Sequence, residues 1–268
     1  MVRSVGCPVA KSTRAGYAGG VATPFTDRLL PADARRAQLR EVIRRTQASD
    51  RPVAVFDLDG TLLDNRPRTV AILRELAHHW REHEVRHSHA KPLYGASVDR
   101  TVYSLSDNLE VLGVHEDHHG PAFDFWKERF FHDDYMHHDV ALPGAVDYVR
   151  AVYAAGANLV YLTGRDLPGM ALGTFKSLRD EGFPIGVVGT ELVVKPDFET
   201  PDPVFKQDVA EALSRLGEVV ASFDNEAANC NLLLKEHPES LTFFVDTLCA
   251  PNPPALHPEV RVIDHFEM

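Results

Sequence analysis

Cysteine and long apolar runs are both scarce in this chain of 268 residues. Its three cysteines, Cys7, Cys230 and Cys249, are odd in number and far apart. They form neither a disulfide framework nor a zinc-binding spacing, so we expect a reducing, cytoplasmic compartment. No stretch approaches the roughly 18 apolar residues of a membrane-spanning helix, and no signal-peptide core is found. We therefore expect no membrane partner.

Positive charge is also in short supply, with 28 Lys and Arg against 39 Asp and Glu and a net charge of −11. This acidity argues against a nucleic-acid polymer as partner. Hydrophobic residues make up 44% of the chain, which is enough for a packed core rather than global disorder. The length fits one large domain, or one domain with an insertion.

Hydrophobic periodicity divides the chain into three parts. Residues 1–31 have no period and many small side chains, which predicts a flexible arm. Strands alternate with helices in residues 32–64 and 141–268, which predicts a doubly wound, mostly parallel, Rossmann-like α/β sheet. Residues 65–140 are mainly helical and are interpreted as an inserted α-helical cap. The expected strands are residues 53–56, 158–162, 185–194, 219–223, 241–245 and 260–263.

Two carboxylates follow the first expected strand. Alternation along an extended backbone places Asp57 and Asp59 on the same side. Like charges at the mouth of a sheet repel unless a cation lies between them or one carboxyl group is protonated. Mg²⁺ suits this position, because it is a hard cation that prefers oxygen ligands and keeps waters for a phosphate.

The stretch Asp57-Leu58-Asp59-Gly60-Thr61 resembles the first motif of the haloacid dehalogenase (HAD) superfamily, whose members are mostly phosphohydrolases with an aspartate nucleophile. The resemblance implies that Asp57 attacks phosphorus and forms an aspartyl-phosphate. It also implies that Asp59 binds Mg²⁺ through its backbone carbonyl. The Asp59 side chain would then be free to act as general acid and base.

The residues after the second expected strand resemble the second HAD motif. Thr163 would offer its hydroxyl group to a phosphoryl oxygen, and Gly164 would also belong to the phosphate-binding residues. The free amides of the following helix would suit an anion. Arg165 would either bind the substrate phosphate in a bidentate manner or pair with a neighbouring carboxylate.

The third motif requires a lysine near the nucleophile, and the chain offers Lys206 and Lys195. We favour Lys206, because Asp202 would cap the helix and Pro203 fits its first position. Asp202 also precedes Lys206 by four residues and would orient it. This segment resembles the phosphatase domain of polynucleotide kinase. Lys195, followed by a proline, remains the alternative.

The fourth motif is represented by Asp224 at the end of another expected strand. Asp224 is the expected direct Mg²⁺ ligand. Asn225 departs from the double-aspartate form, so a water-mediated or orienting contact to the metal is expected of it. Glu226 and Asn229 are weaker candidates for such contacts.

Histidines are concentrated in the expected cap, with eleven of fourteen between His78 and His138. A transition-metal site is one interpretation. Their spacing matches no closed zinc motif, however, and an exposed polar helical surface is the interpretation we favour.

These observations together predict a magnesium-dependent phosphatase acting on a small phosphorylated metabolite. The alternatives are a nucleotide or nucleic-acid end phosphatase, a mutase, a carbon–halogen hydrolase and a HAD-fold binding protein without turnover. A homodimer is left open.

Overall fold

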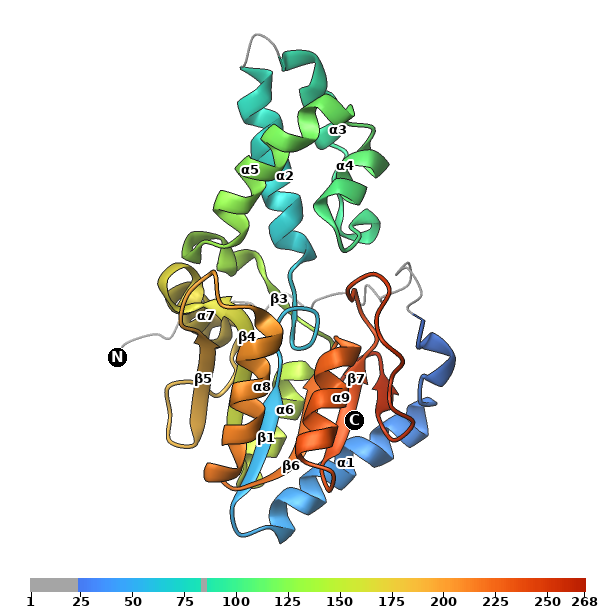
Figure 1. Ribbon diagram of the computed structural model, residues 1–268, viewed down its shortest axis with the longest axis vertical. Coiled ribbons are helices and arrows are strands. Elements are labelled where there is room, and N and C mark those ends of the chain that lie inside the picture. The colour runs from blue at the N-terminus through green and yellow to red at the C-terminus, as the bar shows by residue number, and fades with distance from the viewer. Residues whose placement is uncertain (1–23, 83–85) are drawn as a thin grey trace, which may run out of the picture.

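A six-stranded sheet lies beneath a separate layer of helices in the computed structural model, which describes residues 24–82 and 86–268 (Figure 1). The strand order is β5-β4-β1-β6-β7-β8, and each neighbouring pair is parallel. All five residues of the central strand β1 are buried, as expected of an uncharged strand covered on both faces. The strands are β1 (Pro52–Phe56), β4 (Asn158–Asp166), β5 (Thr190–Lys195), β6 (Glu218–Asp224), β7 (Leu241–Val245) and β8 (Arg261–Ile263).

Helices cover both faces of this sheet, which confirms the predicted doubly wound α/β architecture (Figure 1). One face carries α8 (Asp202–Ala212) and α9 (Ala227–Glu236). The other face carries α1 (Ala32–Ala48), α6 (Ala145–Ala154) and α7 (Leu167–Glu181). Because all strands run in the same direction, their carboxyl ends meet at one edge, on the side of the upper helices.

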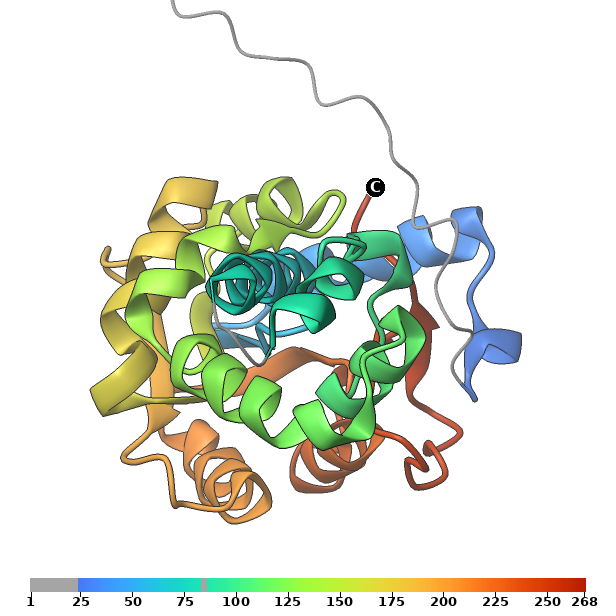
Figure 2. The ribbon, with the colours of Figure 1, turned by 90° about the horizontal axis from the view of Figure 1, so that it is seen from above.

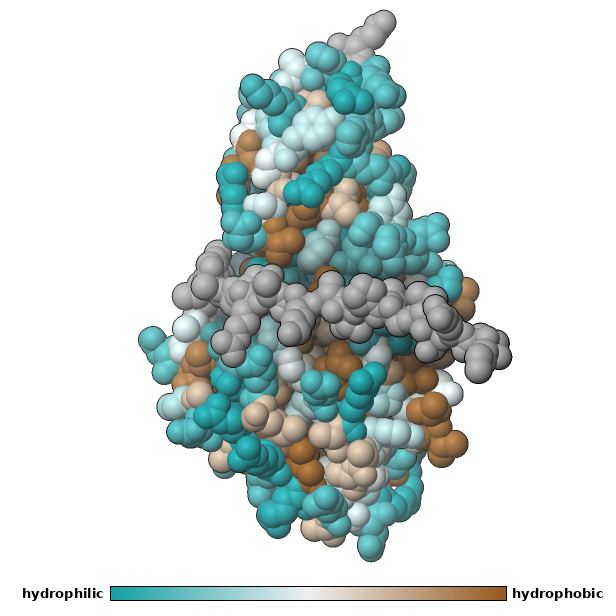
Figure 3. Space-filling model, turned by 180° about the vertical axis from the view of Figure 1, so that it is seen from behind, coloured by the Kyte–Doolittle hydropathy of each residue, from teal (hydrophilic) through white to brown (hydrophobic). Residues whose placement is uncertain are grey.

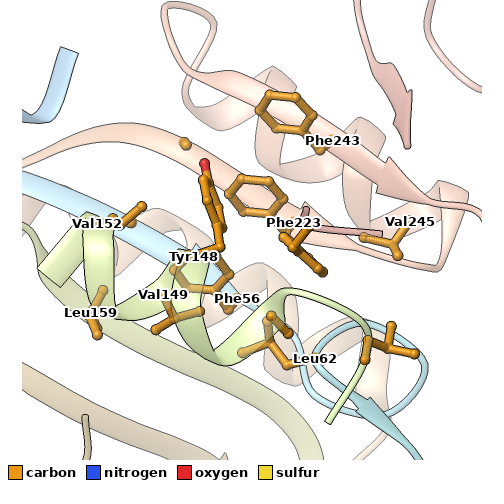
Figure 4. Close-up of a cluster of buried hydrophobic side chains, with 14 of the residues drawn as sticks. Phe56, Leu62, Tyr148, Val149, Val152, Leu159, Phe223, Phe243 and Val245 are labelled. Carbon is orange, nitrogen blue, oxygen red and sulfur yellow. The ribbon is translucent and has the colours of Figure 1, made fainter. Parts of the chain in front are cut away.

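Three aromatic rings from adjacent strands form the centre of the core (Figure 4). Phe223 on β6 stacks on Phe56 of β1 at 4.8 Å and on Phe243 of β7 at 4.6 Å between ring centroids. Tyr148 of α6 meets Phe56 edge-on at 6.4 Å. Full burial of each such side chain contributes roughly 1.5–3 kcal/mol. This packing fixes the three strands relative to one another, and hence the residues that follow them.

The upper layer, residues 66–138, is called the helical insertion below. It enters the chain between β1 and β4, and its helices lie above the sheet edge (Figures 1 and 2). Leu76, Trp80 and Leu109 belong to a hydrophobic core that is separate from the cores of the sheet. The helices of the insertion thus share a core of their own, whereas its last 3-10 turn, Asp133–His138, packs against α7 of the sheet layer. Its helices are α2 (Arg66–Arg81), α3 (Ala90–Leu93), α4 (Leu105–Leu112) and α5 (His119–Phe130), with short 3-10 turns between and after them.

A small antiparallel pair that sequence analysis did not anticipate joins the two connections of the insertion. β2 (Leu63–Asp64) pairs with β3 (Val140–Ala141). Each strand has only two residues, which is too short to give a periodic signal. The pair brings the chain leaving the sheet and the chain returning to it side by side.

The N-terminal segment is described only from Pro24 onward, so most of the expected flexible arm lies outside the described residues. Its described end is anchored rather than loose. Phe25 packs edge-on against Phe244 at 5.0 Å, and Arg28 donates hydrogen bonds to four carbonyl oxygens between Leu256 and Val260. Residues 24–31 are therefore held against the C-terminal segment.

Hydrophilic residues cover much of the insertion when it is viewed from behind (Figure 3). None of its described histidines is buried. Within residues 24–82 and 86–268, no three His, Cys, Asp or Glu side chains are grouped to hold a metal ion. The histidines closest to each other are two pairs, His89 with His118 and His137 with His138, whose ring centroids are 3.9 Å apart in each case. Nor is any helix in these ranges both long and apolar enough to cross a membrane.

Candidate active site

A cavity of about 390 Å³ separates the carboxyl edge of the sheet from the helical insertion. We call it the chamber. Asp57, Asp59, Thr163 and Lys206 line its floor, and Trp126 of α5 contributes to its opposite wall. Four segments far apart in the sequence therefore meet at one place, as the strand order requires. Asp224 lies immediately behind this floor and is 2% exposed.

Lys206 bridges two carboxylates that follow neighbouring strands. Its Nζ donates to Asp57 Oδ1 at 2.9 Å and to Asp224 Oδ2 at 2.8 Å. Burial raises the pKa of Asp57, and the Asp224 and Asp59 charges act in the same direction. Burial alone would lower the pKa of Lys206, but Asp224 and Asp57 outweigh it and raise that pKa. The lysine is therefore held charged between two carboxylates whose repulsion it offsets only in part.

Asp59 is held by two arginines rather than pointing freely into the chamber. Arg165 donates to both of its oxygens, with Nε–Oδ2 at 2.8 Å and Nη2–Oδ1 at 2.7 Å, and Arg68 Nη2 lies 2.9 Å from Oδ1. Asn65 adds a bond of 3.1 Å. Although burial alone would raise it, the pKa of Asp59 is held well below its usual range by Arg165 and Arg68. Its carboxyl group is therefore ionised in this arrangement.

The same two arginines share a second, fully enclosed carboxylate. Asp139 Oδ2 accepts from Arg68 Nη2 at 2.7 Å and from Arg165 Nη2 at 2.6 Å. Arg68 is 0% exposed and Arg165 2%. We call Asp59, Arg68, Asp139 and Arg165 the arginine clamp. Sequence analysis missed Arg68 and Asp139, because neither belongs to a local motif.

Comparison of the sequence with known families matches residues 52–231 to haloacid dehalogenase-like hydrolases. The chain belongs to this family. Among solved structures, a protein from Clostridium difficile assigned as a phosphatase is 14% identical over 80% of this chain and 94% of its own, with a TM-score of 0.50. A HAD family hydrolase from Deinococcus radiodurans R1, solved with bound phosphate and sodium, is 17% identical over 79% of this chain and 90% of its own, with a TM-score of 0.43. Comparison with curated protein sequences finds no match.

The second motif of this HAD-like hydrolase differs in detail from the expectation. β4 continues to Asp166, so Thr163, Gly164 and Arg165 lie inside the strand. The side chain of Asp166 caps α7 by accepting from the amide of Gly169 at 2.8 Å. One of the free amides at the start of α7 is therefore already hydrogen-bonded to a side chain of the protein. Thr163 and Gly164 line the chamber, as expected. Two roles were considered for Arg165, and in the structure it pairs with neighbouring carboxylates.

The expected partnership of Asp202 with Lys206 is wrong. Asp202 is the first residue of α8 and makes no capping bond; the cap position is Pro201. Its carboxylate pairs instead with Lys195 Nζ at 2.7 Å. The two lysines thus have separate partners, and Lys206 is the one beside Asp57. Gly164 permits the approach of Asp202, since a Cβ there would lie 2.5 Å from Asp202 Oδ2.

Asp224, the last residue of β6, is positioned by the start of the following helix, α9. Its Oδ1 accepts from the Glu226 amide at 2.8 Å and from Asn229 Nδ2 at 3.1 Å. Asn225 donates to the Leu248 carbonyl, after β7, at 2.6 Å and accepts from Thr61 in the loop after β1. In this arrangement Asn225 supports the turn that carries Asp59 rather than the carboxylates themselves.

A contact between the insertion and the core was also missed. Tyr103, from the insertion, lies beside the carboxyl group of Glu226, to which the Ala250 amide donates at 2.9 Å. Burial raises the pKa of Glu226 to about 7, and the Asp224 charge adds to this effect. The fourth motif placed Glu226 near the site, but nothing in the sequence indicated Tyr103.

Proposed function

We propose that this hydrolase is a phosphatase that releases phosphate from a small phosphorylated compound through an aspartyl-phosphate at Asp57. The observation that carries the proposal is the Asp57–Lys206–Asp224 arrangement on the chamber floor. An aspartate that attacks a phosphate dianion needs nearby positive charge to offset the repulsion. Lys206 supplies one such charge, and Thr163 adds a hydroxyl group at the same edge of the sheet.

The donor set fits Mg²⁺. Asp57 and Asp224 are hard oxygen ligands. Burial raises the pKa of Asp57, and the neighbouring charges of Asp224 and Asp59 raise it further despite Lys206. Asp57 and Asp224 would hold the ion together with the Asp59 carbonyl. When bound, the metal would supply charge stabilisation for the phosphoryl oxygens. Lys206 would remain the charge that this chain itself contributes.

Proton transfer is assigned to Asp59. As a carboxylate oxygen of Asp57 forms a bond to phosphorus, the ester P–O bond breaks and the departing oxygen takes a proton from Asp59. Water then attacks the phosphorus of the phosphoaspartate and gives a proton to Asp59, while the P–O bond to Asp57 breaks. This step releases inorganic phosphate and restores the Asp57 carboxylate. Donation requires a protonated carboxyl group, whereas the arginine clamp holds Asp59 ionised. Asp59 must therefore loosen from Arg68 or Arg165 before it acts.

We assign the helical insertion the role of a cap. It contacts the core on two sides of the chamber, through Tyr103 to Glu226 and through Phe131, whose ring lies 5.1 Å from that of Phe198 in the core. A chamber roofed in this way excludes water during the reaction. It also favours a small substrate over a nucleic-acid polymer.

The test is phosphate release from 4-nitrophenyl phosphate. We expect hydrolysis with Mg²⁺ and none with EDTA, and Asp57→Asn should abolish turnover while the circular dichroism spectrum stays unchanged. Asp246→Asn is the matched control, because Asp246 follows β7 of the same sheet as Asp57 follows β1, but does not line the chamber. Turnover that survives Asp57→Asn, or that is lost equally in the control, would refute the mechanism.

A further inference from the structure

We infer that the chamber selects phosphate monoesters whose leaving group carries a flat, uncharged ring and no second negative charge. The inference rests on the proposed function and names its substrate class. Two independent features support it, namely the aromatic wall that faces the catalytic carboxylates and the pairing of the positive charges that line the chamber.

The wall opposite the floor is built from aromatic side chains at the end of α5. Trp126, Phe130 and Phe131 all line the chamber. Trp126 stacks on Phe130 at 4.3 Å with an interplanar angle of 24°, and Phe131 stands edge-on to Phe130 at 5.1 Å and 78°. The rings hold one another in place and are partly exposed toward the cavity. Such a rigid wall favours a ring that can stack or meet it edge-on.

The cationic side chains that line the chamber are already paired within the described part of the chain. Arg66 pairs with Asp64 at 2.8 Å, while Arg165 and Lys206 hold the carboxylates of the floor. Beyond these pairs, the lining adds the carboxyl groups of Asp202 and Glu226. A second anionic group on the substrate would therefore be buried next to carboxylates without a cation of its own, which is unfavourable.

The dimensions of the chamber agree with a single ring system. Its volume of about 390 Å³ lies at the small end of ligand-binding pockets, which span roughly 300–1,000 Å³. Contacts of Phe131 with Phe198 and of Tyr103 with Glu226 close it on two sides. Aryl phosphates meet these conditions, as do esters of uncharged heterocyclic alcohols, whereas bisphosphates and phosphorylated carboxylic acids do not.

Binding can be measured without turnover in Asp57→Asn protein by isothermal titration calorimetry in Mg²⁺. The ligands are phenyl phosphate, 4-carboxyphenyl phosphate and glycerol 3-phosphate. Because aromatic contacts and the absence of an unpaired charge each favour the first ligand, we expect it to bind about tenfold more tightly than either of the others. Equal affinity for phenyl and 4-carboxyphenyl phosphate would overturn the inference.

Variants in the same background identify the residues responsible. Phe131→Ala and Trp126→Ala should weaken phenyl phosphate binding but leave glycerol 3-phosphate unchanged. Tyr94→Ala is the control, because Tyr94 is another aromatic residue of the insertion, is 39% exposed and does not line the chamber. Asp202→Asn removes a negative charge from the chamber lining and should strengthen binding of 4-carboxyphenyl phosphate selectively. If Asp202→Asn has no selective effect, or both wall variants bind phenyl phosphate normally, the inference is wrong.

Failure of the proposed function gives a different result. Wild-type protein that binds phenyl phosphate selectively but releases no phosphate would refute the phosphatase and leave the ligand class standing. Wild-type protein that hydrolyses the three esters with equal kcat/KM would support the phosphatase and refute the selectivity.

Discussion

Replacing Lys206 by methionine tests the charge arrangement on which the site depends. Methionine keeps much of the length of lysine but carries no charge. Lys206 is 5% exposed and contacts two carboxylates at 2.9 and 2.8 Å. Its loss would leave Asp57 and Asp224 facing each other inside the protein without a cation, unless a metal ion is bound.

The expected magnitude follows from this burial. Removing one partner of a buried ion pair costs about 3–5 kcal/mol. For a chain of this size, each kcal/mol corresponds to roughly 2–4 °C in the melting temperature, so we expect Lys206→Met to melt about 6–20 °C lower in EDTA. Mg²⁺ should restore part of that loss, because a ligand that binds only the folded state stabilises it.

Lys195→Met provides the matched control. Lys195 is similarly buried, with 7% of its surface exposed, but the side chain of its partner Asp202 is 59% exposed. A pair that is open to solvent contributes roughly 0–1 kcal/mol. Thermal unfolding of both variants and of the wild type, followed by circular dichroism in EDTA and in Mg²⁺, gives the comparison. Phosphate release should fall about 10²–10³-fold in Lys206→Met and little in Lys195→Met.

Two results would refute this reasoning. If Lys206→Met melts within about 2 °C of the wild type in EDTA, the two carboxylates do not depend on the lysine for compensation. If phosphate release is lost in Lys195→Met and kept in Lys206→Met, the choice between the two lysines is reversed, whatever the melting temperatures show.

Two further predictions concern the other charged groups of the site. Arg68→Met removes one of the cations that hold Asp59 ionised, so the pKa of Asp59 should rise and the basic limb of the kcat/KM profile should move to higher pH. Arg129→Met loses pairs with Glu75 and Glu128 but none with Asp59, so it should leave that limb in place. Burial raises the pKa of Glu226 to about 7, so its contribution to stability is complete below the unfolded-state pKa and is lost as pH rises through about 7. The free energy of unfolding in EDTA should therefore decrease as the pH rises from the unfolded-state pKa of Glu226 to about 7. Glu226→Gln should flatten this decrease, and an equally steep decrease in the variant would contradict the assignment.

Local patterns were sufficient to predict the sheet and the residues at its edge. β1 is buried on both faces and reads as an uninterrupted apolar run, and the polar residues after β1 and β6 meet because parallel strands end at one edge. The contact of Lys206 with Asp57 follows from the same topology. The convergence of Asp57, Thr163 and Lys206 on one chamber was therefore accessible from the sequence.

Partner choice among charged side chains was not accessible in this way. The spacing of Asp202 and Lys206 suggested a pair within one helix, but residues 196–201 fold back and place Asp202 against Lys195. Helical spacing gives only a few tenths of a kcal/mol to such a pair, so any nearer cation decides its partner. Arg68 and Asp139 are 71 residues apart, and no local pattern links them.

The arginine clamp also shows why a catalytic role cannot be separated from the position of the insertion. Arg68 lies at the start of α2, and Asp139 comes directly before β3, so both belong to the connections between insertion and core. Arg165 and Asp59 belong to the core side, on β4 and after β1. Any displacement of the insertion that moves these connections must change the hydrogen bonds of Asp59, and with them the pKa of the group assigned to proton transfer. In the proposed mechanism, closure of the chamber and protonation of Asp59 would therefore be coupled through the same buried charges.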